Sequence, residues 1–225
     1  AADIDYMRVS PAAMVDDGAL ESRAAAIRLK QAAAPAAMAP AAGGTVYLTT
    51  ADASGAMVSF IQSNYLGFGS GVVVPGTGIA LQNRGCGFVL DPTHPNGVAG
   101  GKRPFHTIIP GFVTRDGRPL MSFGVMGAHM QPQGHVQMMV RIFDYGQNPQ
   151  SACDAPRWHV APDGVVALEP GLPAATVAGL RERGHRIRLD EPASTFGGGQ
   201  LILKLAEGDY LAASDPRKDG QAVGF

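Results

Sequence analysis

In GGTVYLTTADASGAMVSFIQS, residues 43–63, a glycine pair is followed by two segments rich in β-branched and aromatic residues. Segments 45–51 and 57–63 have the composition of β-strands. Residues 52–56, DASGA, form a turn cluster that contains Gly55. The two segments are therefore predicted to pair as a β-hairpin that begins at Thr45.

The composition changes on the N-terminal side of this hairpin. Residues 19–34, ALESRAAAIRLKQAAA, are rich in alanine and predict a helix. Residues 31–44, QAAAPAAMAPAAGG, carry no charge, and Pro35 and Pro40 exclude a continuous helix. This segment is predicted to be a linker that leads to the hairpin.

Downstream, strand-like and helix-like segments occur in groups. Six glycines punctuate residues 67–85, and a proline-rich loop region covers residues 88–110. Two further hairpins are expected, one around 115–117 and a closing one of GQLILKL and GDYLAASD, together with the strand HRIRL. Three helices are expected: one over HVQMMVRIFDYG, one capped by Asn148-Pro149, and one from Pro173 to Gly184. The first of these helices would carry Val136, Met139, Val140 and Phe143 on one face. This grouping favours α+β layers over a βαβ series.

Composition excludes several classes of protein. The 225 residues include 30 glycines and 17 prolines, which argues against a helical bundle. The net charge is −1, so no basic field is present to bind nucleic acid or an anionic membrane. No apolar run reaches the ~20 residues of a membrane span. The first residues have no signal-peptide pattern and no initiator methionine, so the chain is expected to be the later part of a longer one.

The common cofactor and catalytic motifs are absent. The glycine-rich segment matches neither a phosphate-binding loop nor a dinucleotide fingerprint, and GxSxG does not occur. The six histidines and two cysteines lack metal-ligand spacing, so no metal and no organic cofactor is expected. Cys86 is interpreted as a buried or incidental thiol, and Asp215 and Asp219 as turn formers.

Thr45 follows Gly43-Gly44 directly, and this order permits a specific chemistry. A threonine at a chain N-terminus can use its own α-amine as the base for its hydroxyl. The same hydroxyl can expose that amine by attacking the Gly44 carbonyl in an N-to-O acyl shift, which a glycine pair accommodates. The spacing alone also fits a plain junction between a linker and a strand.

Longer strings resemble one family. The segment GGTVYLTTADASGAMVSFIQSNYLGFGSGVVVPGTGIALQNRG resembles the start of the small subunit of γ-glutamyltransferases (glutathione hydrolases), and GKRPFHTIIPGFVTRDGRPL, FGVMGAHMQPQGHVQMMVRIFDYGQNPQSACDAPRW and ASDPRKDGQA resemble its later blocks. The resemblance implies an N-terminal-nucleophile hydrolase with a four-layer αββα sandwich. Residues 1–44 would be the end of the large subunit and its processing linker, and residues 45–225 the small, catalytic subunit.

The resemblance also implies roles for individual residues. Thr45 matches the nucleophile, and Gly44 precedes the cleavage site. Ser63 matches a hydroxyl residue that hydrogen-bonds the amino group of the nucleophile. Gly127 and Ala128 match the paired glycines whose N–H groups form the oxyanion hole, and an alanine retains that N–H.

The substrate-binding positions depart from the family pattern. His106 and Thr107 take the place of two serines that help to hold the substrate carboxylate, and Tyr65 lies where asparagine is usual. Arg84 and Gly87 replace a glutamine and the aspartate that binds the substrate ammonium. A guanidinium in place of that pair disfavours an ammonium and suits an additional carboxylate, unless Arg84 points into solvent or pairs with an acidic residue of the large subunit.

The sequence therefore predicts an amidohydrolase or acyltransferase that cleaves itself at Gly44–Thr45. Its specificity is expected to have shifted from γ-glutamyl compounds to a carboxylate-bearing amide of the oxamate or glutaryl type. The expected partners are the large subunit of the same precursor, as a heterodimer or a dimer of heterodimers, and a small amide substrate. A periplasmic and a cytoplasmic location both stay open. The alternative is a non-catalytic, uncleaved binding or structural subunit of the same fold.

Overall fold

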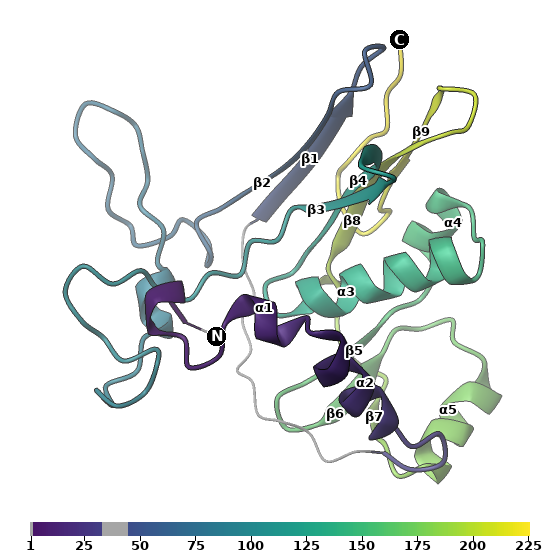
Figure 1. The fold of residues 1–225 in the computed structure, drawn as a ribbon, viewed down its shortest axis with the longest axis horizontal. Coiled ribbons are helices and arrows are strands. Elements are labelled where there is room, and N and C mark those ends of the chain that lie inside the picture. Colours follow the sequence, from purple (N-terminus) through teal and green to yellow (C-terminus); the bar gives the residue numbers. More distant parts are fainter. Residues whose placement is uncertain (1, 33–44) are drawn as a thin grey trace.

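The structure is a computed structural model that describes residues 2–32 and 45–225 (Figure 1). Gly44 and most of the predicted linker lie outside the described residues. The helices are α1 (Pro11–Met14), α2 (Asp17–Ala25), α3 (Met130–Met139), α4 (Pro149–Asp154) and α5 (Ala174–Glu182). No helix in the described part of the chain is long and apolar enough to cross a membrane.

The strands form three sheets. Their bounds are β1 (Thr45–Ala51), β2 (Met57–Ser63), β3 (Gly111–Arg115), β4 (Arg118–Met126), β5 (Trp158–Val160), β6 (Val165–Leu168), β7 (Arg186–Arg188), β8 (Gly198–Lys204) and β9 (Tyr210–Ser214). One sheet is the hairpin β1-β2, the second has the order β3-β4-β8-β9, and the third has the order β5-β6-β7. The predicted hairpins of the first two sheets are confirmed, and the β1-β2 register pairs Thr45 with Ser63.

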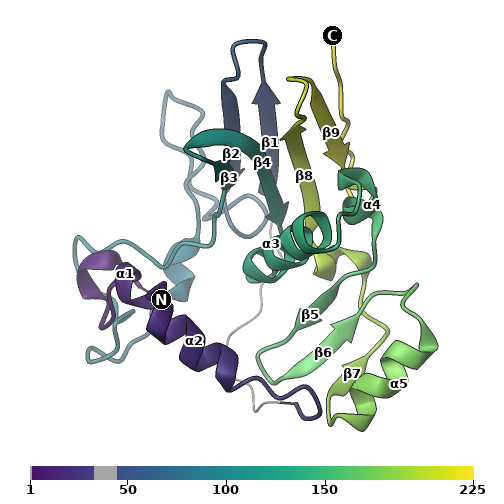
Figure 2. The same ribbon diagram turned by 45° about the vertical axis from the view of Figure 1, so that its right-hand side comes forward.

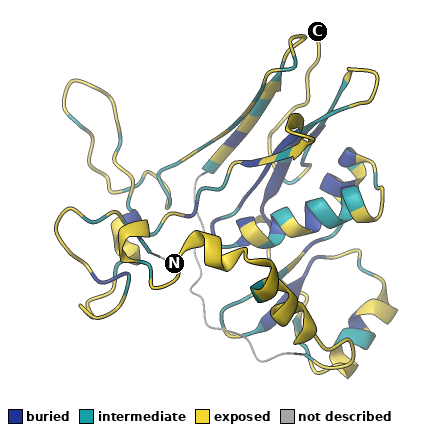
Figure 3. Cartoon of the chain, viewed as in Figure 1, coloured by how far each residue is buried: buried dark blue, intermediate teal, exposed yellow. Residues whose placement is uncertain are grey.

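The β1-β2 hairpin packs face to face on the four-stranded sheet. Along β1, Tyr47 is buried against Gly124 of β4, where an added Cβ would lie 2.5 Å from the tyrosine ring. The hydroxyl of Thr49 hydrogen-bonds that of Ser122 on β4. These contacts come from alternate residues of β1, as the two-residue period of a strand requires. The residues between them, Val46 and Leu48, face outward and are exposed (Figure 3).

Helices α3 and α4 cover the opposite face of the four-stranded sheet (Figure 2). The main core lies between this sheet and these helices, and its buried members are Met121, Phe123, Val125, Met138, Ile142, Ala152, Cys153, Leu201 and Ala213. The layers of this chain are therefore a two-stranded sheet, a four-stranded sheet and a helical layer. The fold is α+β, as the sequence predicts.

The helix that contains His135 begins earlier than expected and changes its geometry. It starts at Met130, and after Met139 it continues as a π-helical segment, Val140–Asp144. Met139 and Phe143 pack against the core as predicted, but Val136 is exposed. Met138 and Ile142 fill the core instead. A π-helical turn has one more residue than an α-helical turn, so a regular 3.6-residue period does not describe this face.

Two further expectations need correction. The helix predicted over residues 19–34 spans only Asp17–Ala25. Strands β6 and β7 are parallel and are joined by α5, which makes one βαβ unit in a chain expected to have layers of grouped elements. The caps are as predicted, because the Asn148 side chain accepts a hydrogen bond from the Gln150 N–H and Gly184 ends α5 with a φ of 91°.

Candidate active site

Thr45 and Ser63 lie side by side at the open end of the β1-β2 hairpin. The Thr45 hydroxyl donates to Oγ of Ser63 at 2.9 Å. The same Oγ accepts a hydrogen bond from the Tyr65 N–H, also at 2.9 Å. The structure thus brings together the predicted nucleophile and its predicted hydroxyl partner, here through the two side chains.

A backbone turn with unpaired N–H groups follows β4. Gly127 has a φ of 130° and Ala128 a φ of 50°, and both values lie in the region that side chains disfavour. Within the described residues, neither the Gly127 N–H nor the Ala128 N–H donates a hydrogen bond. The carbonyls of the turn do have partners, because they accept from the first N–H groups of α3, those of Met130 and Gln131. Two adjacent free N–H groups are the kind of hydrogen-bond donors that form an oxyanion hole.

The packing between the two sheets runs toward this turn, Gly127-Ala128, which is called the oxyanion turn below. Tyr47 of β1 contacts Gly124 of β4, and Thr49 contacts Ser122. The two strands therefore run in opposite directions, and the start of β1, at Thr45, and the end of β4, at Met126, lie toward the same end of the packed sheets.

Arg84 is a buried cation beside Tyr65 and Thr107. Its residue is only 3% exposed, one guanidinium nitrogen donates to the Thr107 hydroxyl at 2.5 Å, and its Cζ lies 4.9 Å from the centre of the Tyr65 ring. Within residues 2–32 and 45–225 no carboxylate pairs with it. The solvent-facing interpretation of Arg84 is therefore wrong for this structure.

The charge of Arg84 affects its neighbours. Burial lowers the pKa of its guanidinium, although arginine stays protonated in proteins. Burial, and then the nearby guanidinium, lower the pKa of His106, whose Nδ1 accepts from the Ile108 N–H at 3.2 Å. His106 is therefore neutral at pH 7, and Arg84 supplies the positive charge of this region.

Tyr65 and Gly87 complete the predicted substrate-binding set. Tyr65 has a φ of 78°, a left-handed conformation that costs of order 1–3 kcal/mol for such a residue and marks functional sites. The Gly87 carbonyl accepts from the side-chain amide of Asn96, and a Cβ added at Gly87 would meet no atom within 4 Å. The buried Asn96 was not foreseen, and only its Pro-Asn-Gly context marks it as a turn residue in the sequence.

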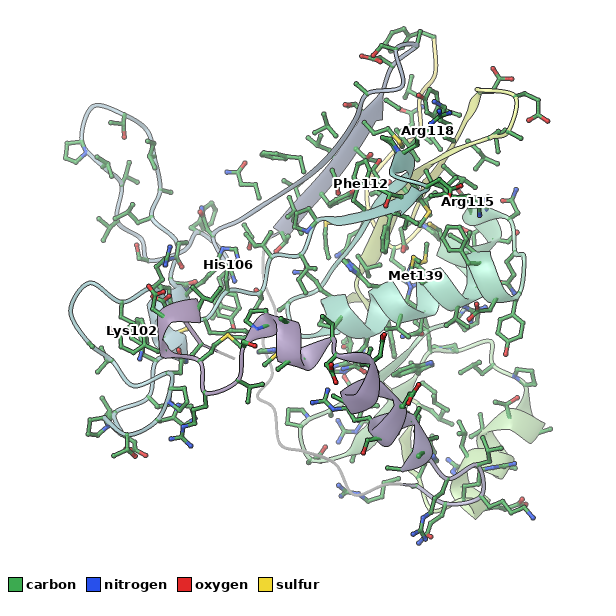
Figure 4. The ribbon with its side chains drawn as sticks, in the orientation of Figure 1. Lys102, His106, Phe112, Arg115, Arg118 and Met139 are labelled. Atoms are coloured by element: carbon green, nitrogen blue, oxygen red, sulfur yellow. The ribbon has the colours of Figure 1, made fainter. Side chains whose placement is uncertain are left out.

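Other features lie apart from this cluster. A groove of about 550 Å³ is lined by residues of the β3–β4 and β8–β9 turns, including Arg115, Arg118 and Lys204. Figure 4 shows Arg115 and Arg118 far from His106, and none of the predicted site residues lines the groove. In the described part of the chain no three His, Cys, Asp or Glu side chains gather to hold a metal. Cys86 is exposed, and burial raises the pKa of the Cys153 thiol to about 12.

A hairpin that starts with threonine, packed on a four-stranded sheet whose other face carries helices, matches the N-terminal-nucleophile hydrolase fold. The sequence model described as gamma-glutamyltranspeptidase matches residues 1–225, and the chain belongs to this family. It is 38% identical over 200 residues to the glutathione hydrolase-like YwrD proenzyme of Bacillus subtilis, covering 86% of this chain and 38% of that protein. It is 39% identical over 189 residues to the oxamate amidohydrolase proenzyme of Klebsiella pneumoniae, covering 81% and 36%. The chain thus spans less than half the length of these relatives.

Solved structures agree with this assignment. The crystal structure of a cephalosporin acylase from Bacillus halodurans superimposes with a TM-score of 0.86 and 49% identity, over 98% of this chain and 40% of that one. A gamma-glutamyltranspeptidase from Pseudomonas nitroreducens, complexed with L-DON, gives a TM-score of 0.67 and 25% identity, over 80% of this chain and 97% of that chain. The predicted fold class and family are confirmed.

Proposed function

We propose that this chain is the catalytic part of an amidohydrolase that cuts itself before Thr45 and then uses Thr45 as its nucleophile. The observation that carries the proposal is the Thr45 hydroxyl, 2.9 Å from Ser63 Oγ, at the end of the packed sheets where β4 leads into the free N–H groups of Gly127 and Ala128. Both curated relatives are named proenzymes, which supports a maturation step.

In the maturation step, Oγ of Thr45 attacks the carbonyl carbon of Gly44. The Gly44–Thr45 C–N bond breaks, an ester forms on Oγ, and the nitrogen takes the hydroxyl proton. Water then hydrolyses the ester, which leaves a carboxylate on Gly44 and both a free amine and a free hydroxyl on Thr45. The glycine pair imposes little steric cost on this attack.

In turnover, the free α-amine of Thr45 takes the hydroxyl proton as Oγ attacks the substrate amide. The oxyanion of the tetrahedral intermediate receives hydrogen bonds from Gly127 and Ala128, where each donor contributes of order 10²–10³ in kcat. The leaving amine takes the proton, and an acyl-enzyme stays on Thr45. Water, or an acceptor amine, then releases the acyl group.

The substrate is proposed to be an amide whose acyl group carries a carboxylate and no ammonium. Arg84 supports this class, because a buried guanidinium that has no carboxylate partner among the described residues offers charge-assisted hydrogen bonds to an incoming carboxylate. Gly87 provides no side chain for an ammonium. Relatives named oxamate amidohydrolase and acylase agree with a substrate outside the γ-glutamyl class.

The test of this proposal compares two chromogenic amides. Glutaryl-p-nitroanilide and γ-glutamyl-p-nitroanilide differ by the α-ammonium of the glutamyl group, and the p-nitroaniline leaving group is the same. We expect kcat/KM for the glutaryl compound to be at least about tenfold higher, a difference of about 1.4 kcal/mol. A preference for the γ-glutamyl compound contradicts the assignment of substrate class and leaves the role of Thr45 intact.

The remaining part of the precursor is proposed to be a large-subunit partner. The outward face of the β1-β2 hairpin exposes Val46, Leu48, Val58 and Phe60, an apolar stripe of the kind that another layer covers (Figure 3). A helical layer of the large subunit on this face would complete the four-layer αββα sandwich. The share of this chain that matches the Pseudomonas chain, 80%, is close to the share that follows Gly44, which supports a division at this bond.

Residues upstream of the proposed cut hold a loop downstream of it. The buried carboxylate of Asp3 accepts from the Arg103 N–H at 2.9 Å, Arg8 donates to the Thr93 carbonyl at 2.8 Å, and Lys102 lies 4.0 Å from the centre of the Tyr6 ring. These contacts would keep the N-terminal piece attached to loop 91–103 after cleavage.

Substituting Asp3 with asparagine is expected to raise amide hydrogen exchange in loop 91–103 severalfold, because the Arg103 N–H loses a charged acceptor. Asp5→Asn is the matched control, since the exposed Asp5 carboxylate reaches Arg103 only at 3.7 Å and is expected to have little effect. Exchange that is equal in Asp3→Asn and the unsubstituted protein would show that this contact does not hold the loop.

A further inference from the structure

A fully buried ion pair lies behind the oxyanion turn. The Arg157 guanidinium and the Asp215 carboxylate are 2.5 Å apart, and their side chains are 1% and 0% exposed. Asp215 does form the turn that the sequence suggested, because its carboxylate accepts from the Arg217 N–H at 2.9 Å and its carbonyl from the Lys218 N–H at 3.2 Å. Its burial and its pairing with Arg157 were not foreseen. A buried ion pair is weak evidence for stability, because desolvating both charges offsets their attraction. A better explanation is that the pair fixes the conformation of the backbone that it bonds, the segment Phe196–Gly199.

The pair holds both ends of the segment Phe196–Gly199. Arg157 Nη1 donates to the Phe196 carbonyl at 3.1 Å. Asp215 Oδ2 accepts from the Gly199 N–H at 2.7 Å, and the Asp215 N–H donates to the Gly199 carbonyl at 3.0 Å. The segment between these anchors contains Gly197, which has a φ of 75°.

Gly197 packs directly on the turn that carries the free N–H groups. A Cβ added at Gly127 would lie 3.1 Å from the Gly197 Cα, and a Cβ added at Gly197 would collide with the Met126 carbonyl. No side chain fits between the two segments, so the position of Gly197 limits the position of the Gly127 peptide. An oxyanion hole needs its donors about 2.7–3.1 Å from the developing charge, and their positions fixed to within about 0.5 Å.

We propose that the Arg157–Asp215 pair positions the oxyanion turn through Gly197. This inference rests on the proposed amidohydrolase function. Arg157 and Asp215 are positioning residues, because they act through the Phe196–Gly199 segment. The pair holds the Gly127 and Ala128 N–H groups in the arrangement that stabilises the tetrahedral intermediate.

The test compares two buried carboxylate-to-amide changes in the complete, self-cleaved protein. Asp215→Asn removes the negative charge and turns one of the two carboxylate oxygens, which bond Gly199, Arg157 and Arg217, into an amide donor. Glu169→Gln changes a carboxylate of the same charge network that bonds Arg217 and the Arg157 backbone N–H but has no hydrogen bond to residues 196–199. The readouts are kcat and KM on a chromogenic amide, with active sites counted by covalent labelling of Thr45 with an electrophilic glutamine or glutaryl analogue.

We expect kcat per labelled site to fall tenfold or more in Asp215→Asn, with KM within about threefold, because the oxyanion forms only in the transition state. Glu169→Gln is expected to keep kcat within about threefold. Gly197→Ala, which changes no charge, should reproduce the loss in kcat, and it decides the question if Asp215→Asn does not fold. Unchanged kcat in Asp215→Asn or Gly197→Ala, or an equal fall in Glu169→Gln, overturns the inference. If Thr45 is neither labelled nor needed for activity, it is the proposed function that fails.

Discussion

Substituting Thr45 with alanine is expected to leave the Gly44–Thr45 bond intact and to lower amide hydrolysis roughly 10⁴-fold or more, to the background level. Alanine removes the Oγ that is proposed to attack both the Gly44 carbonyl and the substrate. It also prevents formation of the free α-amine, so the base is lost together with the nucleophile. The effect is therefore larger than that of a usual single catalytic substitution.

Thr45→Ser is the matched control for this experiment. Serine retains an Oγ that can bond Ser63, so self-cleavage and turnover are expected to continue at lower rates. Alanine leaves the strand backbone and its pairing with Ser63 unchanged, so loss of folding is not expected. A Thr45→Ala protein that still hydrolyses amides at an appreciable rate would contradict the assignment of the nucleophile.

The double substitution Arg84→Gln with Gly87→Asp is expected to reverse the substrate preference, with a change of 100-fold or more in the ratio of glutaryl to γ-glutamyl kcat/KM. The change removes a buried cation and supplies a carboxylate for the substrate ammonium. The site can accept it, because a Cβ at Gly87 meets no atom within 4 Å and the backbone there is not in the left-handed region. The measurement is the competition between the two p-nitroanilides.

Two single substitutions separate charge from shape in this experiment. Gly87→Ala fills the same space without charge and should leave the preference unchanged. Arg84→Lys retains the charge but cannot make the two-pronged contact of a guanidinium, so it should weaken glutaryl hydrolysis without restoring γ-glutamyl hydrolysis. If the double variant keeps the original preference, Arg84 and Gly87 do not determine which acyl group is bound.

The hairpin could be predicted because its signals are local. Residues 45–51 and 57–63 have strand composition on both sides of a short turn, and the register that follows pairs Thr45 with Ser63. The cap residues Asn148 and Gly184 act on their immediate neighbours for the same reason. The roles of Gly127 and Ala128 came from the resemblance of longer strings, and the free N–H groups of the turn then agreed with it.

Features that depend on distant residues could not be predicted. The short charged stretch around Asp215 indicates a turn, but its residues do not indicate that Asp215 is buried. The residue it pairs with, Arg157, is 58 residues away in the sequence. The π-helical segment after Met139 breaks the period on which the expected apolar face relied. Tyr65, which contacts Arg84, has a positive φ of 78°. Tyrosine rarely adopts this conformation, so the residue type gives no sign of it in the sequence.

The burial of Arg84 adds physical support to the hypothesis that the substrate carries an additional carboxylate. A charged group taken out of water without a counter-ion costs several kcal/mol, even after relaxation. One hydroxyl and one aromatic face offset only part of this cost. In the proposed function, a substrate carboxylate would supply the counter-ion that Arg84 lacks among the described residues, and its binding would stabilise this region.

N-terminal sequencing of the complete protein, after purification and incubation at neutral pH, shows directly whether Thr45 becomes an N-terminal residue. Two chains are expected, one of which begins Thr45-Val46-Tyr47-Leu48-Thr49, and a single uncut chain is expected in Thr45→Ala. A protein that stays uncut and yet hydrolyses amides would contradict the account, and one that stays uncut and inactive would be the non-catalytic subunit of the alternative hypothesis.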